Sequence, residues 1–447
     1  MRATQLWIAL VGFGIALTSS NAADAADWPQ WMGPTRNGIW TEDGILTKFP
    51  AAGPKVLWRV PVAGGYSGPA VANGRVYLTD YVTDADVRKL STPDRPGAIA
   101  GVERVWCFDA ATGKQLWKHE YDCPYTISYP AGPRCTPTVA GDKVYTLGAE
   151  GHLICFDAAS GKIIWSKDLR KEYKTETPIW GFTGHPLVDG DTLYCLVGGE
   201  GSLVVAFHKD TGREKWRALS SEETGYCPPT MIEAGGTKQL LLWDPKKINS
   251  LDPATGKLYW SVPLVPQYGM SIMGPQKGGD ILFAGGIGGA SVALQLDKTK
   301  PAVKELWRGT KQTAVYPVNS TPIIDGSTIY GVDETGFLRA VDLRTGKRLW
   351  ETLEPVVGKV KARKVDSATA FLVKNGAYYY LFNEKGELVI AKLSPQKYEQ
   401  IDRAKLLEPT GTTFGRDVVW SHPAYANRCI FARNDRELIC VSLAAKQ

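Results

Sequence analysis

The side chains best suited to chemistry in this chain belong to five histidines and eight cysteines. His185 and His422 stand at equivalent positions, because each precedes a proline at the start of a predicted inner strand. Two imidazoles that face one channel are suitable ligands for a transition metal ion. No carboxylate or third histidine occurs at a matching spacing. The sequence therefore predicts no metal site.

The cysteines are placed for structure rather than for metal or haem attachment. None of them forms a Cys-x-x-Cys pair, so a zinc ribbon and a c-type haem have no support. Cys429 and Cys440 are symmetric about Asn434 and Asp435. A two-residue hairpin there predicts that the two cysteines lie opposite each other, within the range that a disulfide tolerates. The alternative is that both are small buried side chains.

The first 25 residues indicate export. A basic start at Arg2 is followed by an apolar run from Leu6 to Leu17, and small residues then allow cleavage after Ala22 or Ala25. Because a membrane span needs about 20 apolar residues, residues 1–25 are interpreted as a secretory signal peptide. The first cysteine is residue 107, so no lipid attachment site lies nearby. We expect a periplasmic or extracellular protein without a membrane span or lipid anchor.

A nine-residue pattern, Asp-x-x-Thr-Gly-Lys-x-x-Trp, recurs along the chain. It indicates which strands and turns position the histidines and cysteines. Alternating apolar stretches precede it, which predicts β-strands on both sides of a tight turn. The period of 43 to 51 residues is typical of a four-stranded propeller blade. The closing tryptophans are predicted to pack on neighbouring blades, whereas Trp40, outside the repeat, is expected to matter less for stability. Counting the matching strand near the N-terminus, they are Trp58, Trp117, Trp165, Trp216, Trp260, Trp307 and Trp350.

The two chain ends complete the blade count. Residues 53–60 contain an outer strand with no inner strands before it, and residues 422–443 contain three inner strands with no outer strand after them. Together they predict one closing blade. A degenerate copy at 368–393, with Ile401 near the tryptophan position, adds another. The predicted fold is all-β: an eight-bladed propeller of four-stranded antiparallel blades over residues 55–443, preceded by an N-terminal arm at 26–54.

The loops that precede the innermost strands are predicted to gather on one face. Flat aromatic side chains with a few polar groups suit a planar cofactor, a sugar ring or a peptide, although single rings of this kind commonly pack inside a propeller. A polar insertion at 80–104 is interpreted as a solvated excursion in preference to a lid. The candidate ligand-binding residues are Tyr125, Tyr129, Arg134, Trp180, His185, Tyr268, Tyr316, Asn319, Arg416, Trp420 and His422.

The repeated unit, extended to Ala/Cys-x-Asp-x-x-Thr-Gly-Lys-x-x-Trp, resembles the tryptophan-docking motif of the pyrroloquinoline-quinone (PQQ)-like β-propeller repeat family. The segment WPQWMGPTRNG at 28–38 is similar to the N-terminal segment of exported members. That family includes quinone-dependent dehydrogenases and non-catalytic propellers such as the lipoprotein of the barrel-assembly machine. The resemblance implies, for the dehydrogenases, a vicinal cysteine pair, a tryptophan floor, a catalytic Asp, and Ca²⁺ held by Glu, Asn and Asp. No two cysteines are adjacent in this chain.

The resulting hypothesis is an exported, monomeric binding or scaffold protein without a catalytic residue or cofactor. Its partner is expected to be a protein, a small molecule or a saccharide on the aromatic face. A net charge of +6 over 447 residues is too low to favour nucleic acid. Two alternatives stay open: a PQQ- and Ca²⁺-dependent alcohol or sugar dehydrogenase with an altered site, and a carbohydrate-binding or polysaccharide-processing partner.

Overall fold

The computed structural model describes residues 26–359 and 363–445 of the chain. The predicted signal peptide at 1–25 lies outside the described residues. Within the described part, no helix is both long enough and apolar enough to cross a membrane.

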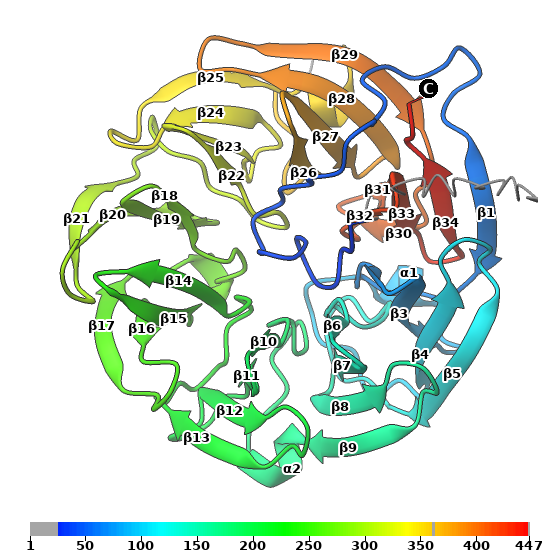
Figure 1. Cartoon of the computed structure of the whole chain (residues 1–447), viewed down its shortest axis with the longest axis vertical. Helices are drawn as coiled ribbons and strands as arrows, with labels where there is room; N and C mark the ends of the chain where they lie inside the picture. The colour runs from blue at the N-terminus through cyan, green and yellow to red at the C-terminus, as the bar shows by residue number, and fades with distance from the viewer. Residues whose placement is uncertain (1–25, 360–362, 446–447) are drawn as a thin grey trace, which may run out of the picture.

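The strands form eight four-stranded antiparallel sheets around a central axis (Figure 1). The last sheet joins three C-terminal strands to β1, which confirms the predicted propeller and its closure by both ends of the chain. From the innermost strand outward, the blades are: blade 1, β2 (Ala70–Ala72), β3 (Arg75–Val82), β4 (Val102–Asp109) and β5 (Gln115–Asp122); blade 2, β6 (Thr138–Ala140), β7 (Lys143–Leu147), β8 (His152–Asp157) and β9 (Ile163–Asp168); blade 3, β10 (Leu187–Asp189), β11 (Thr192–Leu196), β12 (Val204–His208) and β13 (Glu214–Ala218); blade 4, β14 (Thr230–Ala234), β15 (Thr237–Trp243), β16 (Lys247–Leu251) and β17 (Leu258–Pro263); blade 5, β18 (Gln276–Gly278), β19 (Ile281–Gly286), β20 (Ala290–Leu296) and β21 (Val303–Arg308); blade 6, β22 (Ile323–Asp325), β23 (Thr328–Val332), β24 (Leu338–Asp342) and β25 (Arg348–Thr352); blade 7, β26 (Ala370–Asn375), β27 (Tyr378–Asn383), β28 (Glu387–Leu393) and β29 (Tyr398–Lys405); and blade 8, β32 (Ala424–Ala426), β33 (Cys429–Arg433), β34 (Glu437–Ser442) and β1 (Val56–Pro61).

Short elements decorate the loops of the described chain. They are the helices α1 (Val87–Leu90), α2 (Leu169–Tyr173) and α3 (Glu354–Val357), the 3₁₀ turn η1 (Gln267–Gly269), and a separate hairpin of β30 (Gly411–Thr413) and β31 (Arg416–Val418).

The hydrophobic core lies between the blades. The second and third strands of a blade are buried on both faces, as in β11, where every residue is buried. The outermost strands are partly exposed, and β13 presents Glu214 and Lys215 to solvent. One apolar cluster joins Tyr77 of blade 1 to Phe156 of blade 2. Each blade is therefore stabilised mainly by its two neighbours.

The repeated turn receives the tryptophan of the preceding blade. In blade 1, the Asp109 carboxylate accepts hydrogen bonds from the Thr112 N–H (2.9 Å) and hydroxyl (2.7 Å). Gly113 follows, and a Cβ atom there would lie 2.8 Å from the ring of Trp58. The Trp58 indole donates to the Ala110 carbonyl at 3.0 Å. Indole donation to a carbonyl of the next blade recurs in the pairs Trp117–Ala158, Trp165–Lys209, Trp216–Pro253, Trp307–Leu343 and Trp350–Ser394.

Two positions depart from this arrangement. Trp260 donates to the Gln239 side chain of its own blade at 3.0 Å. The copy of the repeat in blade 5, from Asp297 to Trp307, is two residues longer than the others and has no glycine. In blade 7, Asp402 pairs with Ile390 at the tryptophan position, and Ile401 is the bulged residue before it. The Asp402 carboxylate accepts the Phe49 N–H of the arm at 2.9 Å.

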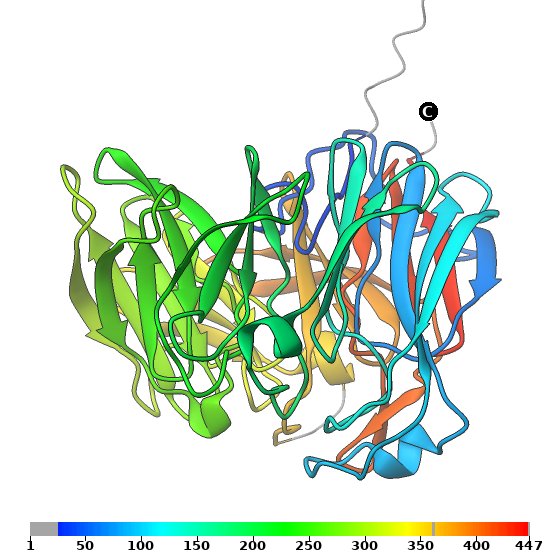
Figure 2. The same ribbon diagram turned by 90° about the horizontal axis from the view of Figure 1, so that it is seen from below.

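The N-terminal arm crosses one end of the ring, on the side opposite α1 and the β30–β31 hairpin (Figure 2). Trp28 exchanges backbone hydrogen bonds with Val71 of blade 1. Arg36 is buried, and its guanidinium donates to the carbonyls of His185 (3.0 Å), Pro229 (2.9 Å) and Pro186. Burial lowers the pKa of Arg36 to about 9. The arm thus closes one end of the central channel.

The predicted insertion packs against the propeller. Strands β3 and β4 extend to Val82 and from Val102, so the loop itself covers 83–101. Arg88 donates to the Thr410 carbonyl and to Asp417, each at 2.6 Å. Most residues of 83–101 are exposed to solvent, and these contacts tie the segment to the loop and hairpin that precede blade 8.

The predicted placement of Cys429 directly opposite Cys440 is wrong. Cys429 pairs with Ser442, and Cys440 pairs with Phe431, because the turn of the hairpin covers 434–437 rather than two residues. Both cysteines are buried free thiols. Their mutual hydrogen bond, together with burial, raises the pKa of Cys440.

Candidate functional site

A cavity of about 1090 Å³ lies among the loops that precede the innermost strands. It reaches inward to Trp31 of the arm, which forms part of its floor. The structure brings together in it most of the predicted ligand-binding residues: Tyr129, Arg134, Trp180, His185, Tyr268, Asn319, Trp420 and His422.

Three predicted residues do not line the cavity. Tyr125 is fully buried, stacks on Tyr81 at a centroid distance of 3.8 Å and donates to the Glu103 carboxylate. Tyr316 is 3% exposed, and its hydroxyl donates to the Thr310 carbonyl at 2.6 Å. Arg416, at the start of β31, donates to Glu384 at 2.8 Å. These side chains pack or support loops around the cavity.

The floor brings two histidines against one tryptophan. Trp31 stacks on His185, with centroids 5.2 Å apart, and meets His422 edge-on at 6.0 Å. His185 Nδ1 accepts the Thr136 N–H at 2.9 Å, so Nε2 carries the proton of the neutral ring. Burial lowers the pKa of His185 well below its usual value and lowers that of His422 to about 3. Both rings are therefore neutral at pH 7.

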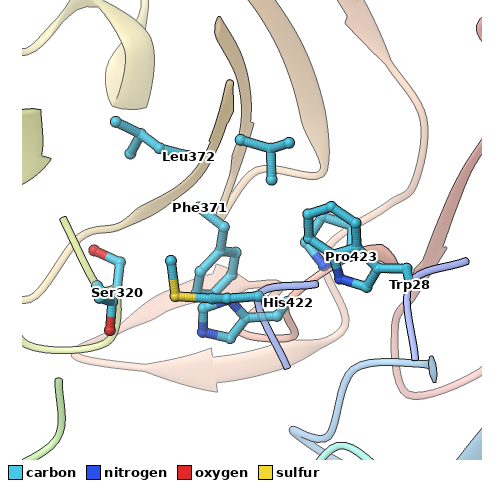
Figure 3. Close-up of a pocket in the computed structure, with 9 residues that line it drawn as sticks. Trp28, Ser320, Phe371, Leu372, His422 and Pro423 are labelled. Atoms are coloured by element: carbon cyan, nitrogen blue, oxygen red, sulfur yellow. The ribbon is translucent and has the colours of Figure 1, made fainter. Parts of the chain in front are cut away.

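Below the floor the side chains are closely packed. Figure 3 shows His422 beside Phe371, with Ser320 and Trp28 nearby. The rings of Phe371 and His422 are 3.9 Å apart. Among the described residues, no group of three or more His, Cys, Asp and Glu side chains is placed to hold a metal ion.

Charged groups occupy different parts of the cavity wall. Arg134 donates to the carbonyls of Ser128 (2.8 Å) and Tyr129 (2.7 Å) and lies over the Tyr66 ring at 5.0 Å. Arg95 of the insertion donates to the Thr177 carbonyl at 2.6 Å. The carboxylates of the wall, from blades 3 to 7 and the loops between them, are Glu223, Glu334 and Asp366. Burial raises the pKa of Glu334.

Three aromatic residues at the cavity adopt left-handed backbone conformations. They are Tyr129 (φ 51°), Tyr268 (φ 58°) and Phe414 (φ 45°). Tyr268 and Phe414 are 67% and 60% exposed. Bulky residues rarely adopt such φ values, and strained residues cluster at ligand-binding sites.

Sequence reasoning missed several residues of the cavity. Phe414 lies in the loop before the innermost strand of blade 8 and precedes Gly415, which is a detectable turn signal. Trp31 and Arg95 lie outside the repeat, in the arm and the insertion, so the period could not place them. Tyr226 and Glu334 have no local signature at all.

These features define the class of protein: a closed eight-bladed propeller whose repeats dock by tryptophan and whose axial cavity is closed at one end by an N-terminal arm. The chain belongs to the family described as outer membrane protein assembly factor BamB, whose model matches residues 101–267 and 244–447.

Individual relatives are distant. The outer membrane protein assembly factor BamB of Moranella endobia (strain PCIT) is 26% identical over 297 residues, covering 64% of this chain. The chain spans 59% of the length of that curated relative. The crystal structure of BamB from Moraxella catarrhalis has a TM-score of 0.54 at 15% identity, over 88% of this chain and 98% of that one. Quinohemoprotein alcohol dehydrogenase from Comamonas testosteroni has a TM-score of 0.59 at 14% identity, over 96% and 82%. The two structures show that the fold is shared.

The cavity side chains do not fit PQQ with Ca²⁺. The eight cysteines are isolated in sequence and buried, so no vicinal pair can lie against a quinone. Glu334 already accepts the Gly288 N–H at 2.8 Å, and Asp366 pairs with Lys364 at 3.0 Å. With Glu223, these carboxylates come from separate loops and form no common cation site.

Proposed function

We propose that this protein is an exported, non-enzymatic binding module whose ligand enters the axial cavity from the end opposite the arm. The observation that carries the proposal is the cavity of about 1090 Å³, with aromatic walls and a floor closed by the arm. Binding pockets typically measure about 300–1,000 Å³ and combine apolar walls with a few polar groups. The rigid ring holds these walls in place without a ligand, which lowers the entropic cost of binding.

The closed floor restricts what can bind. Trp31 and Arg36 fill the channel, so a polymer cannot thread through the ring. A compact molecule, or the end of a chain, is expected instead.

The test is ligand binding followed by tryptophan fluorescence and calorimetry with defined oligosaccharides and peptides. Trp180→Ala removes a wall of the cavity and should weaken binding at least tenfold. Trp260→Ala, on an outer strand of blade 4, is the matched control and should leave the affinity unchanged. Absence of binding by every probe, or equal affinities in both variants, would contradict the proposal. N-terminal sequencing of the secreted protein checks cleavage after Ala22 or Ala25.

A second candidate function is docking of a partner protein at the same end of the ring. It is favoured by the family, whose relatives are named outer membrane protein assembly factors. The exposed rings of Tyr268 and Phe414 would be the anchors, since aromatic residues dominate binding hot spots. A photoreactive residue at 414 should crosslink to components of the outer membrane assembly machinery, whereas the same residue at 163 on the outer strand β9 should not.

A further inference from the structure

Two ring N–H groups at the floor of the cavity have no partner. The side chains of Trp31 and His185 are 4% and 8% exposed, and their rings stack with an angle of 13° between the planes. His185 Nδ1 accepts the Thr136 N–H, so the ring proton lies on Nε2, which faces away from Thr136. Among the described residues, no group accepts a hydrogen bond from His185 Nε2 or from Trp31 Nε1.

Both nitrogens are open to the cavity. The indole nitrogen of Trp106 is also unpaired, but it is sealed from solvent. Trp31 Nε1 and His185 Nε2 are not sealed in this way, and both rings line the cavity. A ligand atom in the cavity can therefore reach them. It must be a hydrogen-bond acceptor, because both groups are donors.

The protons on these nitrogens exclude a metal ion as their ligand. An indole nitrogen is a donor only, and His185 Nε2 has no free lone pair while Nδ1 accepts the Thr136 N–H. The acceptor is therefore an atom with lone pairs, such as an oxygen of a carbonyl, a carboxylate or a phosphate.

The charge around the floor is positive and favours an anion. The buried Arg36 guanidinium donates to the Gln30 side chain (2.9 Å) and to three backbone carbonyls, including that of His185 (3.0 Å), and it has no described carboxylate as a partner. Burial is the largest cause that lowers the pKa of His185, the charge of Arg36 is the next, and no described carboxylate contributes. A buried cation without a counter-charge is unfavourable, so an anion beside it is stabilised.

We propose that His185 Nε2–H and Trp31 Nε1–H bind an oxyanion, the carboxylate or phosphate at the end of an organic ligand. This inference rests on the proposed function, because it assigns the chemical group that reaches the floor of the same cavity. The cavity of about 1090 Å³ is far larger than a single ion. The rest of the ligand packs on aromatic walls such as Trp180.

The first variant is Trp31→Phe, which removes one donor and keeps a flat ring against His185. Affinity for the oxyanion should fall about tenfold, the usual effect of one hydrogen bond to a charged group. Trp106→Phe is the matched control. It also removes an unpaired indole N–H, but one that is sealed in β4 and lies outside the cavity. It should leave the affinity unchanged.

The second variant is His185→Asn. The amide oxygen of Asn can replace Nδ1 as the acceptor of the Thr136 N–H, whereas nothing remains at the position of Nε2. Affinity should again fall about tenfold. His208→Asn is the matched control, because His208 Nδ1 also accepts a backbone N–H, that of Asp210 at 3.3 Å, but the ring lies outside the cavity. The melting temperature of each variant checks that it is folded.

The probes are phenylacetate and phenyl phosphate, with phenylacetamide as the neutral counterpart and acetate and inorganic phosphate as the free ions. Isothermal titration calorimetry at constant ionic strength measures the affinities, because added salt would itself screen the charges. Binding of phenylacetate or phenyl phosphate at least tenfold tighter than phenylacetamide, weakened in both floor variants and in neither control, supports the proposal.

The other outcomes overturn separate parts of it. Equal binding of phenylacetate and phenylacetamide, or unchanged affinity in both floor variants, overturns the oxyanion subsite and leaves the binding function standing. Free acetate or phosphate binding as tightly as the phenyl compounds overturns the organic ligand in favour of an inorganic or small free ion. If no oxyanion binds although an oligosaccharide or peptide does, only the subsite fails. If nothing binds at all, the proposed function fails with it.

Discussion

At the scale of single residues, Gly161 and Gly141 both adopt left-handed backbone conformations, with φ of +70° and +64°. A Cβ atom on Gly161 would lie 2.6 Å from the ring of Trp117, whereas one on Gly141 meets nothing within 4 Å. Gly141→Ala should cost only the backbone strain, about 1 kcal/mol. Gly161→Ala should cost at least about 2 kcal/mol more, because the indole must move. Chemical denaturation measures the difference, and equal losses would contradict tryptophan docking.

The tryptophans themselves are expected to differ. Trp117 is buried and bonds to the next blade, so Trp117→Ala should lower the free energy of unfolding by about 3–5 kcal/mol. The same range is predicted for Trp165 and Trp350. Trp260→Ala should cost less, since its indole bonds within its own blade. Equal losses in the free energy of unfolding for all four variants would contradict the distinction between Trp260 and the tryptophans that dock on the next blade.

For Trp40 the structure leads to a larger expected effect on stability than the sequence did. It is 2% exposed, donates to Glu42 at 2.8 Å and packs on Tyr380 and Tyr425. Its replacement should therefore cost as much as that of Trp117. The repeat could predict the docking tryptophans, because each is fixed by its own turn. It could not predict Trp40, whose burial depends on residues more than 300 positions away.

His422 should make stability depend on pH. The unfolded chain binds a proton there below about pH 6.5, whereas burial keeps the folded ring neutral until about pH 3. The free energy of unfolding that comes from keeping His422 neutral is therefore present in full above about pH 6.5 and is lost as the pH falls toward 3. Between pH 7 and 5, His422→Gln should reduce the fall in the free energy of unfolding by about 2 kcal/mol. Denaturation curves at both pH values measure it, and parallel losses in both proteins would contradict it.

At the scale of elements, the arm acts as a floor through one side chain. Arg36→Ala leaves the carbonyls of His185, Pro186 and Pro229 without their buried donor. Because each unpaired buried group costs about 1–3 kcal/mol, the free energy of unfolding should fall by at least 3 kcal/mol. Arg344→Ala, which removes an exposed cation 3.7 Å from Asp280, should change it by less than about 1 kcal/mol. A similar small loss in both variants would mean that the arm does not hold the ring.

Elements outside the repeat could not be placed from sequence. The period and the hairpin signals predicted the blades because strand pairing is local. The position of the insertion could not be predicted, because the residues that Arg88 contacts, Thr410 and Asp417, lie more than 300 positions away in the sequence. The turn at 434–437 was misjudged because Asn434 caps it, accepting the N–H groups of Arg436 and Glu437 at 2.8 Å. That capping makes the loop two residues longer and shifts the register, so that Cys440 lies opposite Phe431 and Cys429 lies opposite Ser442.

At the scale of the whole molecule, closure of the ring followed from complementary incomplete blades at the two ends of the chain. β1 supplies the outer strand that β32, β33 and β34 lack, and Trp58 of β1 docks on blade 1. The sequence could not show which end of the channel is closed, because that depends on where the arm lies. Only the fold showed that predicted cavity residues such as Tyr129 and His185 share their space with Trp31.

The likeness of the whole ring to a quinohemoprotein alcohol dehydrogenase leads to a final prediction. The folds agree with a TM-score of 0.59, but the cofactor depends on a few side chains that the shared fold does not require. This chain has no adjacent cysteines, and the cavity carboxylates Glu223, Glu334 and Asp366 stand on separate loops. Incubation with PQQ and Ca²⁺ should therefore leave no quinone absorbance after gel filtration, and no dye reduction with alcohols or aldoses. An apo-quinoprotein dehydrogenase reconstituted in parallel is the control. Stoichiometric PQQ retained by the protein, with turnover on any of these substrates, would show that the ring binds PQQ through other residues. The protein would then be an oxidoreductase and not a binding module.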